Sequence, residues 1–363
     1  MALTEQTLTA ALQTVIDPNT GKDFVSSKAL KNLHIQGGDV SFDVVLGYPA
    51  KSQIADFRKA LIAAAKTVAG VDNVSANITV DIVAHAAQRG VALLPQVKNI
   101  IAVASGKGGV GKSTTAANLA LALAAEGAKV GLLDADIYGP SQPMMMGIEG
   151  RPESTDGQTM DPLENYGVQV MSIGFLVDQD EAMIWRGPMA TQALEQLLRQ
   201  TNWKSLDYLI VDMPPGTGDI QLTLSQRVPM TGSVIVTTPQ DIALLDAKKG
   251  IKMFEKVGVP ILGLVENMAV HVCTNCGHIE HIFGADGGKK MAAQYGMDYL
   301  GALPLNMQIR LQADSGKPTV VADPDGEVAS IYKAVARQVA VKIAAKAKDF
   351  SSKFPSIKIS KET

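Results

Sequence analysis

The second part of the chain alternates short apolar runs with longer stretches whose apolar residues recur every three or four positions. The apolar runs have the length of buried strands, and they cover residues 99–104, 129–133, 168–173, 207–211, 233–237, 260–265 and 299–302. The stretches between them have helical spacing, as in residues 115–126, 188–200 and 328–348. The pattern therefore predicts an α/β fold with a mostly parallel sheet flanked by helices.

The first 90 residues have a different pattern, which predicts a small α/β domain. Helical spacing over residues 5–15 and 54–68 indicates two helices. Apolar residues alternate over residues 40–46 and 74–83, as in strands, and the glycines at 37 and 38 are a hairpin signal. We therefore expect four parts in the chain, which are a small domain at 1–90, a linker at 91–98, a larger domain at 99–348 and a basic tail at 349–363.

Composition narrows the class of protein. The chain has 363 residues, 46% of them hydrophobic, and a formal net charge of −3, which gives no sign of a nucleic-acid partner. The N-terminus lacks the basic and apolar regions of a signal peptide, and no apolar run is long enough for a membrane span. The only two cysteines, Cys273 and Cys276, cannot form a disulfide framework. We therefore expect a cytoplasmic protein that binds neither nucleic acid nor membrane.

The main candidate for chemistry is a P-loop between the strand at 99–104 and the helix at 115–126. Its glycines let backbone N–H groups approach a phosphate chain, and the new helix points its positive end at the anion. Lys112 is expected to reach the β- and γ-phosphates, and the Ser113 hydroxyl to bind Mg²⁺. The predicted nucleotide-binding residues of this loop are Gly106, Lys107, Gly108, Gly109, Val110, Gly111, Lys112, Ser113 and Thr114.

The same glycines also match the dinucleotide pattern G-x-G-x-x-G, with Asp134 near the position of a ribose-binding acid. That interpretation would make the protein an NAD-binding module or a hydride-transfer enzyme. A dinucleotide loop has no use for Lys-Ser at the start of its helix, and a second acidic strand end follows at Asp212. The NTPase is therefore the favoured interpretation.

Acidic residues end two of the predicted strands. Asp212 follows an apolar run as a Walker B aspartate does and can hold Mg²⁺, although alone it could equally cap a turn. Gly216 is expected to let a backbone N–H approach the γ-phosphate. Asp134 and Asp136 end another strand, and we expect only one of these two acids to face the nucleotide. We expect Asp136 to orient the attacking water, with Asp134 as the alternative.

Lys107 is additional to a minimal P-loop. From the second position of the loop it cannot easily curl onto the γ-phosphate of its own subunit. It could instead act as a positive finger on the nucleotide of a partner subunit. A solvated lysine is the other interpretation that the pattern leaves open.

Cys273 and Cys276 lie two residues apart in a predicted loop and supply half of a tetrahedral thiolate site. A twofold axis through the pair would place four thiolates around one centre. A redox dithiol normally opens a helix in a thioredoxin-like unit, which this pattern lacks. Zinc bound within one chain would need His278 and His281, whose spacing is tight. The residues alone leave an iron–sulfur cluster and zinc equally open. We expect His271, His278 and His281 to lie around the site or on the surface and not to be ligands.

The P-loop with its additional lysine resembles the deviant Walker A motif of the MinD, ParA and nitrogenase-iron-protein superfamily. Further segments closely resemble the Mrp/ApbC family of iron–sulfur cluster carrier ATPases, at residues 133–141, 185–189, 212–219 and 265–268. This resemblance runs from about residue 98 to about residue 321. Residues 1–90 resemble the small domain of the metal-sulfur cluster biosynthesis family, without the cysteine that members often carry.

The resemblance implies an ATPase that binds a labile 4Fe-4S cluster through Cys273 and Cys276 across a homodimer. Such a carrier would take the cluster from a donor and transfer it to apo-proteins. Lys107 would act across a nucleotide-sandwich dimer, and Asn267 would contact the adenine. The implied cofactors are ATP, Mg²⁺ and the 4Fe-4S cluster. The alternatives are a MinD/ParA-like positioning ATPase, in which the cysteines would be idle, and a zinc-stapled regulatory NTPase.

Overall fold

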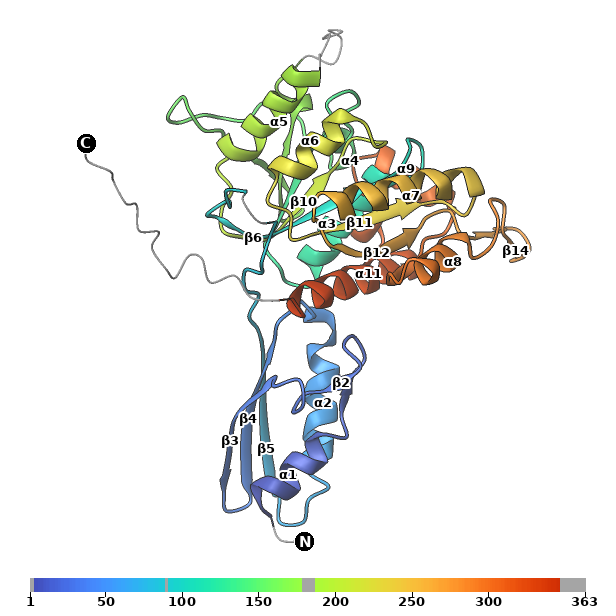
Figure 1. Cartoon of the computed structure of the whole chain (residues 1–363). Helices are drawn as coiled ribbons and strands as arrows, with labels where there is room; N and C mark the ends of the chain where they lie inside the picture. Colours follow the sequence, from blue (N-terminus) through green and yellow to red (C-terminus); the bar gives the residue numbers. More distant parts are fainter. Residues whose placement is uncertain (1–2, 89–90, 178–186, 347–363) are drawn as a thin grey trace.

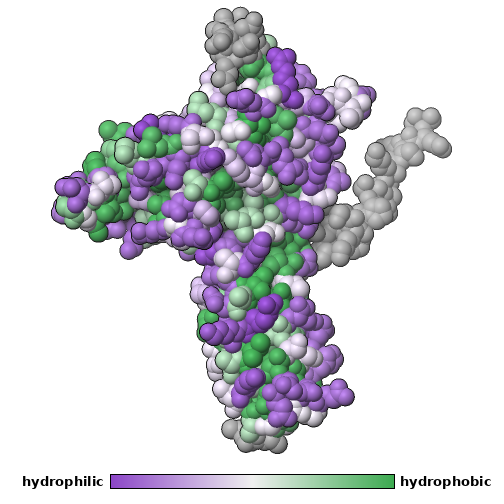
Figure 2. Space-filling view, turned by 180° about the vertical axis from the view of Figure 1, so that it is seen from behind, coloured by the Kyte–Doolittle hydropathy of each residue, from purple (hydrophilic) through white to green (hydrophobic). Residues whose placement is uncertain are grey.

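A computed structural model describes residues 3–88, 91–177 and 187–346 of the chain and shows a narrow N-terminal part beside a wider second part (Figure 1). Figure 2 shows the same two-lobed outline from behind. The N-terminal part contains α1 (Glu5–Leu12), β1 (Ile16–Asp17), β2 (Lys22–Asp23), β3 (Leu30–Gln36), β4 (Asp39–Leu46), a 3-10 turn (Lys51–Gln53), α2 (Ile54–Ala65) and β5 (Asn73–Val80).

The second part begins with the elements that carry the P-loop and continues as alternating strands and helices. Its first half contains β6 (Val97–Ala104), α3 (Lys112–Ala125), β7 (Val130–Asp134), α4 (Gln142–Met145), β8 (Leu163–Asn165), β9 (Val168–Ser172), α5 (Gly187–Gln200) and β10 (Leu206–Asp212). Its second half contains α6 (Asp219–Arg227), β11 (Gly232–Thr237), α7 (Asp241–Lys256), β12 (Ile261–Glu266), β13 (His271–Val272), β14 (Ile279–Glu280), α8 (Gly287–Gln294), β15 (Tyr299–Ala302), α9 (Met307–Asp314), α10 (Thr319–Ala322) and α11 (Glu327–Ala344).

The N-terminal part is a three-stranded sheet with two helices on one side (Figure 1). β3 and β4 form the predicted antiparallel hairpin, which turns at Gly37 with a φ of 62°. α2 then leads back so that β5 pairs parallel with β4. Alternate residues of β4 are buried, as expected for a sheet with one face covered. The short β1 and β2 are not foreseen by the sequence pattern, because two residues show no periodicity.

An eight-stranded sheet organises the second part, in the order β15-β12-β11-β6-β10-β7-β9-β8. All neighbouring strands are parallel except the edge pair β8 and β9. The mostly parallel sheet flanked by helices is therefore confirmed. β6, which leads into the P-loop, lies between β11 and β10, so the loop emerges at the middle of the sheet.

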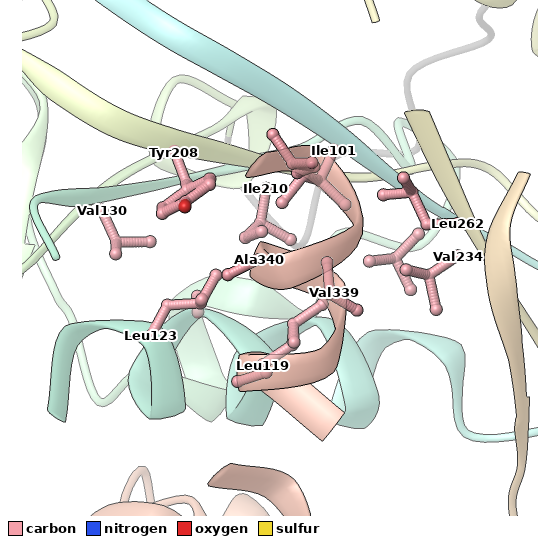
Figure 3. Close-up of a cluster of buried hydrophobic side chains, with 14 of the residues drawn as sticks. Ile101, Leu119, Leu123, Val130, Tyr208, Ile210, Val234, Leu262, Val339 and Ala340 are labelled. Carbon is pink, nitrogen blue, oxygen red and sulfur yellow. The ribbon is translucent and has the colours of Figure 1, made fainter. Parts of the chain in front are cut away.

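The core of this part lies between the sheet and the helices α3 and α11, which pack together (Figure 3). Leu119 and Leu123 of α3 and Val339 of α11 meet Ile101 and Ile210 of the central strands. These side chains are between 0% and 1% exposed. The continuous apolar runs of the central strands follow from this burial.

β6 begins two residues earlier than the sequence predicts, and β5 ends three residues before the predicted strand does. β6 begins at Val97, which pairs with Leu206 of β10, so residues 97 and 98 belong to the strand and not to the expected linker. The division of the chain at residue 90 stays a prediction. The basic tail, and residues 185 and 186 of one family-like segment, lie outside the described residues. No helix within the described ranges is long and apolar enough to cross a membrane.

A buried acid joins the two parts at the end of α3 that lies far from the P-loop. Glu126 is 1% exposed, and its carboxylate accepts hydrogen bonds from the Ser52 hydroxyl at 2.7 Å and the Ser52 backbone N–H at 3.0 Å. Arg337 of α11 donates to the same carboxylate at 2.5 Å and to Asn19 at 3.3 Å. The N-terminal part is therefore held against both α3 and α11 through one charged group.

We expect Glu126→Ala to lower the free energy of unfolding by about 3 kcal/mol, because it leaves the largely buried Arg337 guanidinium without its counter-charge. Chemical denaturation measures this loss. Glu195→Ala removes a surface partner of Arg199 and Arg227 and serves as the control, with an expected loss below about 1 kcal/mol. Equal losses for the two variants would contradict the role given to Glu126.

Candidate functional site

The P-loop has the backbone that a phosphate-binding loop needs. It connects β6 to α3, and Gly109 and Gly111 both have a φ of 79°, a conformation that disfavours other residues. Gly106 is required for a different reason, because a Cβ there would lie 2.1 Å from the backbone carbonyl carbon of Asp246 in α7. The packing of α7 against the loop, in addition to space for phosphates, therefore explains this glycine.

Lys112, the first residue of α3, lies inside the protein with 6% of its surface exposed. Its Nζ forms an ion pair with Asp212 Oδ1 and lies 3.1 Å from the Ser113 hydroxyl. Asp212 is fully buried at the end of β10, which is next to β6 in the sheet. The structure thus brings Lys112, Ser113 and Asp212 together as predicted, with the lysine charge balanced by the acid.

Asp134 ends β7 and pairs in register with Asp212 of the neighbouring β10, so two buried carboxylates lie side by side. Burial, then the negative charge of Asp212, raises the pKa of Asp134 to about 7. Backbone N–H groups of Gln142 and Asp136 donate to Asp134 at 3.0 and 3.2 Å and oppose this shift. Two ionised acids with one lysine leave a net negative charge, which favours the binding of a divalent cation.

Asp136 also faces this charged group, which corrects one expectation. Burial raises its pKa, while the charge of Lys112 lowers it and that of Asp212 raises it. The sequence argument allowed only one of Asp134 and Asp136 to face the nucleotide. Residues two positions apart on an extended segment point to the same face, so alternation itself places both acids on one side, and both carboxylates interact with Lys112 and Asp212.

Three other predicted residues lie in the loop or next to it. Lys107 is partly buried, and its carbonyl accepts a hydrogen bond from the Ser105 hydroxyl at 2.8 Å. Gly216 has a φ of 90°, and its N–H donates to the Ser105 carbonyl at 3.1 Å, so this N–H must change partner to meet a phosphate. Asn267, 8% exposed, donates from Nδ2 to the Val110 carbonyl at 2.8 Å. Its predicted contact with adenine stays a prediction.

Gln142 belongs to this site and was not predicted. Its side chain is fully buried and donates to Asp212 Oδ2 at 2.9 Å and to the Ser113 carbonyl at 3.1 Å. The residue begins α4, and it follows a family-like segment that ends at residue 141. In the sequence, the one signal for Gln142 is its position shortly after Asp134 and Asp136.

The two cysteines lie in a tight turn between the short strands β13 and β14, at the edge of the molecule (Figure 1). Cys273 is partly exposed and Cys276 exposed. Hydrogen bonds from the backbone N–H groups of Cys276 and Asn275, then from the Cys276 thiol, lower the pKa of Cys273. The turn therefore favours thiolates, the form that binds metals.

The histidines near the turn have backbone partners. The Nδ1 of His271 lies 3.1 Å from the Leu305 carbonyl, and the Nδ1 of His281 lies 3.0 Å from the Ala269 carbonyl. Within the described part of the chain, no three His, Cys, Asp or Glu side chains are grouped so that they could hold a metal ion. The geometry therefore gives no support to zinc bound within one chain by Cys273, Cys276, His278 and His281.

A central P-loop strand, a helix starting at the loop lysine and an acid at the next strand end are the features of P-loop NTPases. The family described as NUBPL iron-transfer P-loop NTPase matches residues 96–340. The chain belongs to this family. A second family, described as iron–sulfur cluster assembly protein, matches residues 5–78, in agreement with the resemblance expected for the N-terminal part.

Individual relatives agree with this assignment. An iron–sulfur cluster carrier protein from Pseudomonas fragi is 63% identical over 269 residues, which cover 74% of this chain and 94% of the relative. A nucleotide-binding protein from Archaeoglobus fulgidus, solved in complex with ADP, is 37% identical with a TM-score of 0.56, covering 64% of this chain and 90% of that one. The cell division ATPase MinD from Pyrococcus furiosus, 23% identical with a TM-score of 0.51, shares the fold over 66% of this chain and 98% of its own.

Proposed function

We propose that this chain is an ATP-dependent iron–sulfur cluster carrier, which holds a labile 4Fe-4S cluster between two copies of itself and delivers it to apo-proteins. One observation carries the proposal. The same chain combines a P-loop site with an exposed turn that offers two thiols, and within the described residues no third His, Cys, Asp or Glu is grouped with them to hold a metal ion. The relative from Pseudomonas fragi, named a carrier of such clusters, supports the choice of cargo.

ATP binds with its phosphates against the backbone of the loop at residues 106–113. Lys112 exchanges its partner, leaving Asp212 for the β- and γ-phosphates, which keeps the buried lysine paired with negative charge throughout. The N–H of Gly216 leaves the Ser105 carbonyl and turns to the γ-phosphate. Asn267 lies close enough to the loop to meet the base, which we assign as adenine.

The residues of the site fit Mg²⁺, which prefers oxygen ligands. Ser113 and Asp212 would hold it, and Asp134 lies beside Asp212 in register. The Oε1 of Gln142 is buried and has no hydrogen-bond partner in the described part of the chain, so it is available to a water molecule of the metal. When bound, Mg²⁺ neutralises charge that develops on the phosphates.

Asp136 is the residue to which we assign the orientation of the attacking water, because it is partly exposed beside Lys112. Lys107 is assigned to the nucleotide of the partner subunit. This arrangement makes hydrolysis depend on the dimer, so that two nucleotide sites and one cluster site assemble together.

A mixing experiment tests this arrangement. Asp136→Ala and Lys107→Ala homodimers should each hydrolyse ATP at least about a hundredfold more slowly than the wild type. A mixture of the two contains heterodimers in which one site has both an intact Asp136 and an intact partner Lys107. Steady-state turnover of the mixture should exceed the sum of the parents, whereas turnover equal to that sum would contradict action across the interface.

The cluster is bound by the thiolates of Cys273 and Cys276 from each copy, which together give four. These thiolates need a reducing compartment, and we place the protein in the cytoplasm for that reason.

Anaerobic reconstitution with iron and sulfide tests the proposal. We expect about four iron and four sulfide per dimer, a visible absorbance band and loss of that band when an apo-protein takes the cluster. A chain that instead retains one tightly bound zinc and takes up no iron would contradict the proposed cargo.

A further inference from the structure

We propose that Gln142 is a positioning residue for the magnesium site, which fixes the carboxylates of Asp134 and Asp212 and turns its Oε1 toward the water shell of the metal. The inference rests on the proposed hydrolysis of ATP. It extends the part given above to the Oε1 of this fully buried side chain, because it adds the positioning of both carboxylates by the amide and the backbone N–H of Gln142.

The orientation of the Gln142 amide is determined by its partners. Nε2 donates to Asp212 Oδ2 at 2.9 Å and to the Ser113 carbonyl at 3.1 Å. Both partners can only accept, so the NH₂ group must face them, and Oε1 is the atom of the amide that is left without a partner among the described residues. The structure thus leaves one arrangement of the amide group.

The backbone of the same residue holds the second acid. Its N–H donates to Asp134 Oδ2 at 3.0 Å, where the Ser172 hydroxyl also donates at 3.1 Å. Gln142 thereby links the start of α3, the end of β10 and the end of β7, three elements that have no covalent connection near the site. A shift of any one of them would break a buried hydrogen bond.

Asp212 uses its two oxygens for two different donors. Lys112 pairs with Oδ1 and Gln142 donates to Oδ2. When Lys112 turns to the phosphates, the amide of Gln142 still donates to Oδ2 and keeps the carboxylate of Asp212 in the same orientation. An uncharged donor can do this without repelling an arriving cation, which a second lysine could not.

The Oε1 of Gln142 supplies the link to the metal. It is buried and, within the ranges that the structure describes, it has no hydrogen-bond partner. A buried acceptor without a donor is destabilising, and water molecules bound to Mg²⁺ are donors of the kind it lacks. Magnesium binding would therefore satisfy this atom as well as the acids.

The test is the dependence of nucleotide binding on Mg²⁺ in Gln142→Met, which has a similar volume and no amide. Binding of a fluorescent ADP analogue is measured in EDTA and over a series of Mg²⁺ concentrations. We expect the Mg²⁺ concentration for half-maximal effect to rise about tenfold, the equivalent of about 1.4 kcal/mol, because a hydrogen bond to a charged group is lost. The affinity in EDTA should stay within about twofold of the wild type.

Gln169→Met is the control, since the side chain of this glutamine on β9 bonds the backbone of Lys204, with no other partner among the described residues, and lies outside the site. It should leave both quantities unchanged. If the methionine variant does not fold, Gln142→Asn takes its place in the test. It keeps the amide on a shorter side chain, and it should shift the Mg²⁺ dependence in the same direction. Unchanged Mg²⁺ dependence, or an equal loss of affinity in EDTA, would overturn the inference. A wild-type chain that binds no nucleotide would overturn the proposed ATPase and the inference with it.

Discussion

Lys112→Ala is expected to abolish ATP hydrolysis, with a loss in turnover of at least about a hundredfold. The lysine supplies the point charge on the β- and γ-phosphates, and the described site places it at the first residue of α3 for that contact. The variant should also unfold more easily, by about 3 kcal/mol, because fully buried Asp212 loses its counter-charge. Steady-state hydrolysis and chemical denaturation measure the two effects.

A double variant separates the catalytic loss from the loss of stability. Lys112→Ala combined with Asp212→Asn removes both charges of the pair, and it should recover most of the stability without recovering hydrolysis. Both proteins should still accept a cluster in reconstitution, because the cysteine turn is built from β13 and β14. Near-normal hydrolysis by Lys112→Ala would refute the assignment of the P-loop.

Replacing either cysteine is expected to eliminate the cluster. In a symmetric dimer, Cys273→Ala or Cys276→Ala removes two of four thiolates at once, so iron content after reconstitution should fall to background. ATP hydrolysis should persist at an altered rate, since neither sulfur belongs to the P-loop site. Iron analysis and ATPase assays on the same preparations measure both results.

Neighbouring residues supply the controls for the cysteine variants. Thr274→Ala changes an exposed residue of the same turn and should keep full iron content. His278→Ala and His281→Ala should also keep it, whereas loss of iron in either would restore histidine as a ligand. Full complementation of a strain deficient in cluster delivery by the double cysteine variant would refute the carrier mechanism, however well that variant hydrolysed ATP.

Much of the fold could be predicted because its signals are local. The apolar runs identified the strands of the parallel sheet, and the P-loop lies between the predicted strand and helix. The boundary at Val97 could not be predicted, since it depends on the pairing of that residue with Leu206. The edge strand β8 has three residues, too few for a periodic pattern.

The parts of the site that could not be predicted from the sequence depend on which strands become neighbours in the sheet. The ion pair of Lys112 and Asp212 exists because β10 lies beside β6, an order that the sequence pattern does not give. The same order brings Gln142 between two strand ends. The expectation that only one of Asp134 and Asp136 faces the nucleotide failed because side chains two positions apart on an extended segment share a face, and both acids interact with Lys112 and Asp212.

Asn267 donates to the carbonyl of Val110 in the P-loop and lies six positions before Cys273 in the sequence. A short stretch of chain thus spans the distance from the phosphate site to the thiols. Thermodynamic linkage is symmetric between two binding sites. If ATP binding lowers the affinity of the dimer for the cluster by some factor, cluster binding must lower its affinity for ATP by the same factor. A loaded dimer that releases its cargo on binding ATP is therefore also one that binds ATP less tightly until the cargo has left.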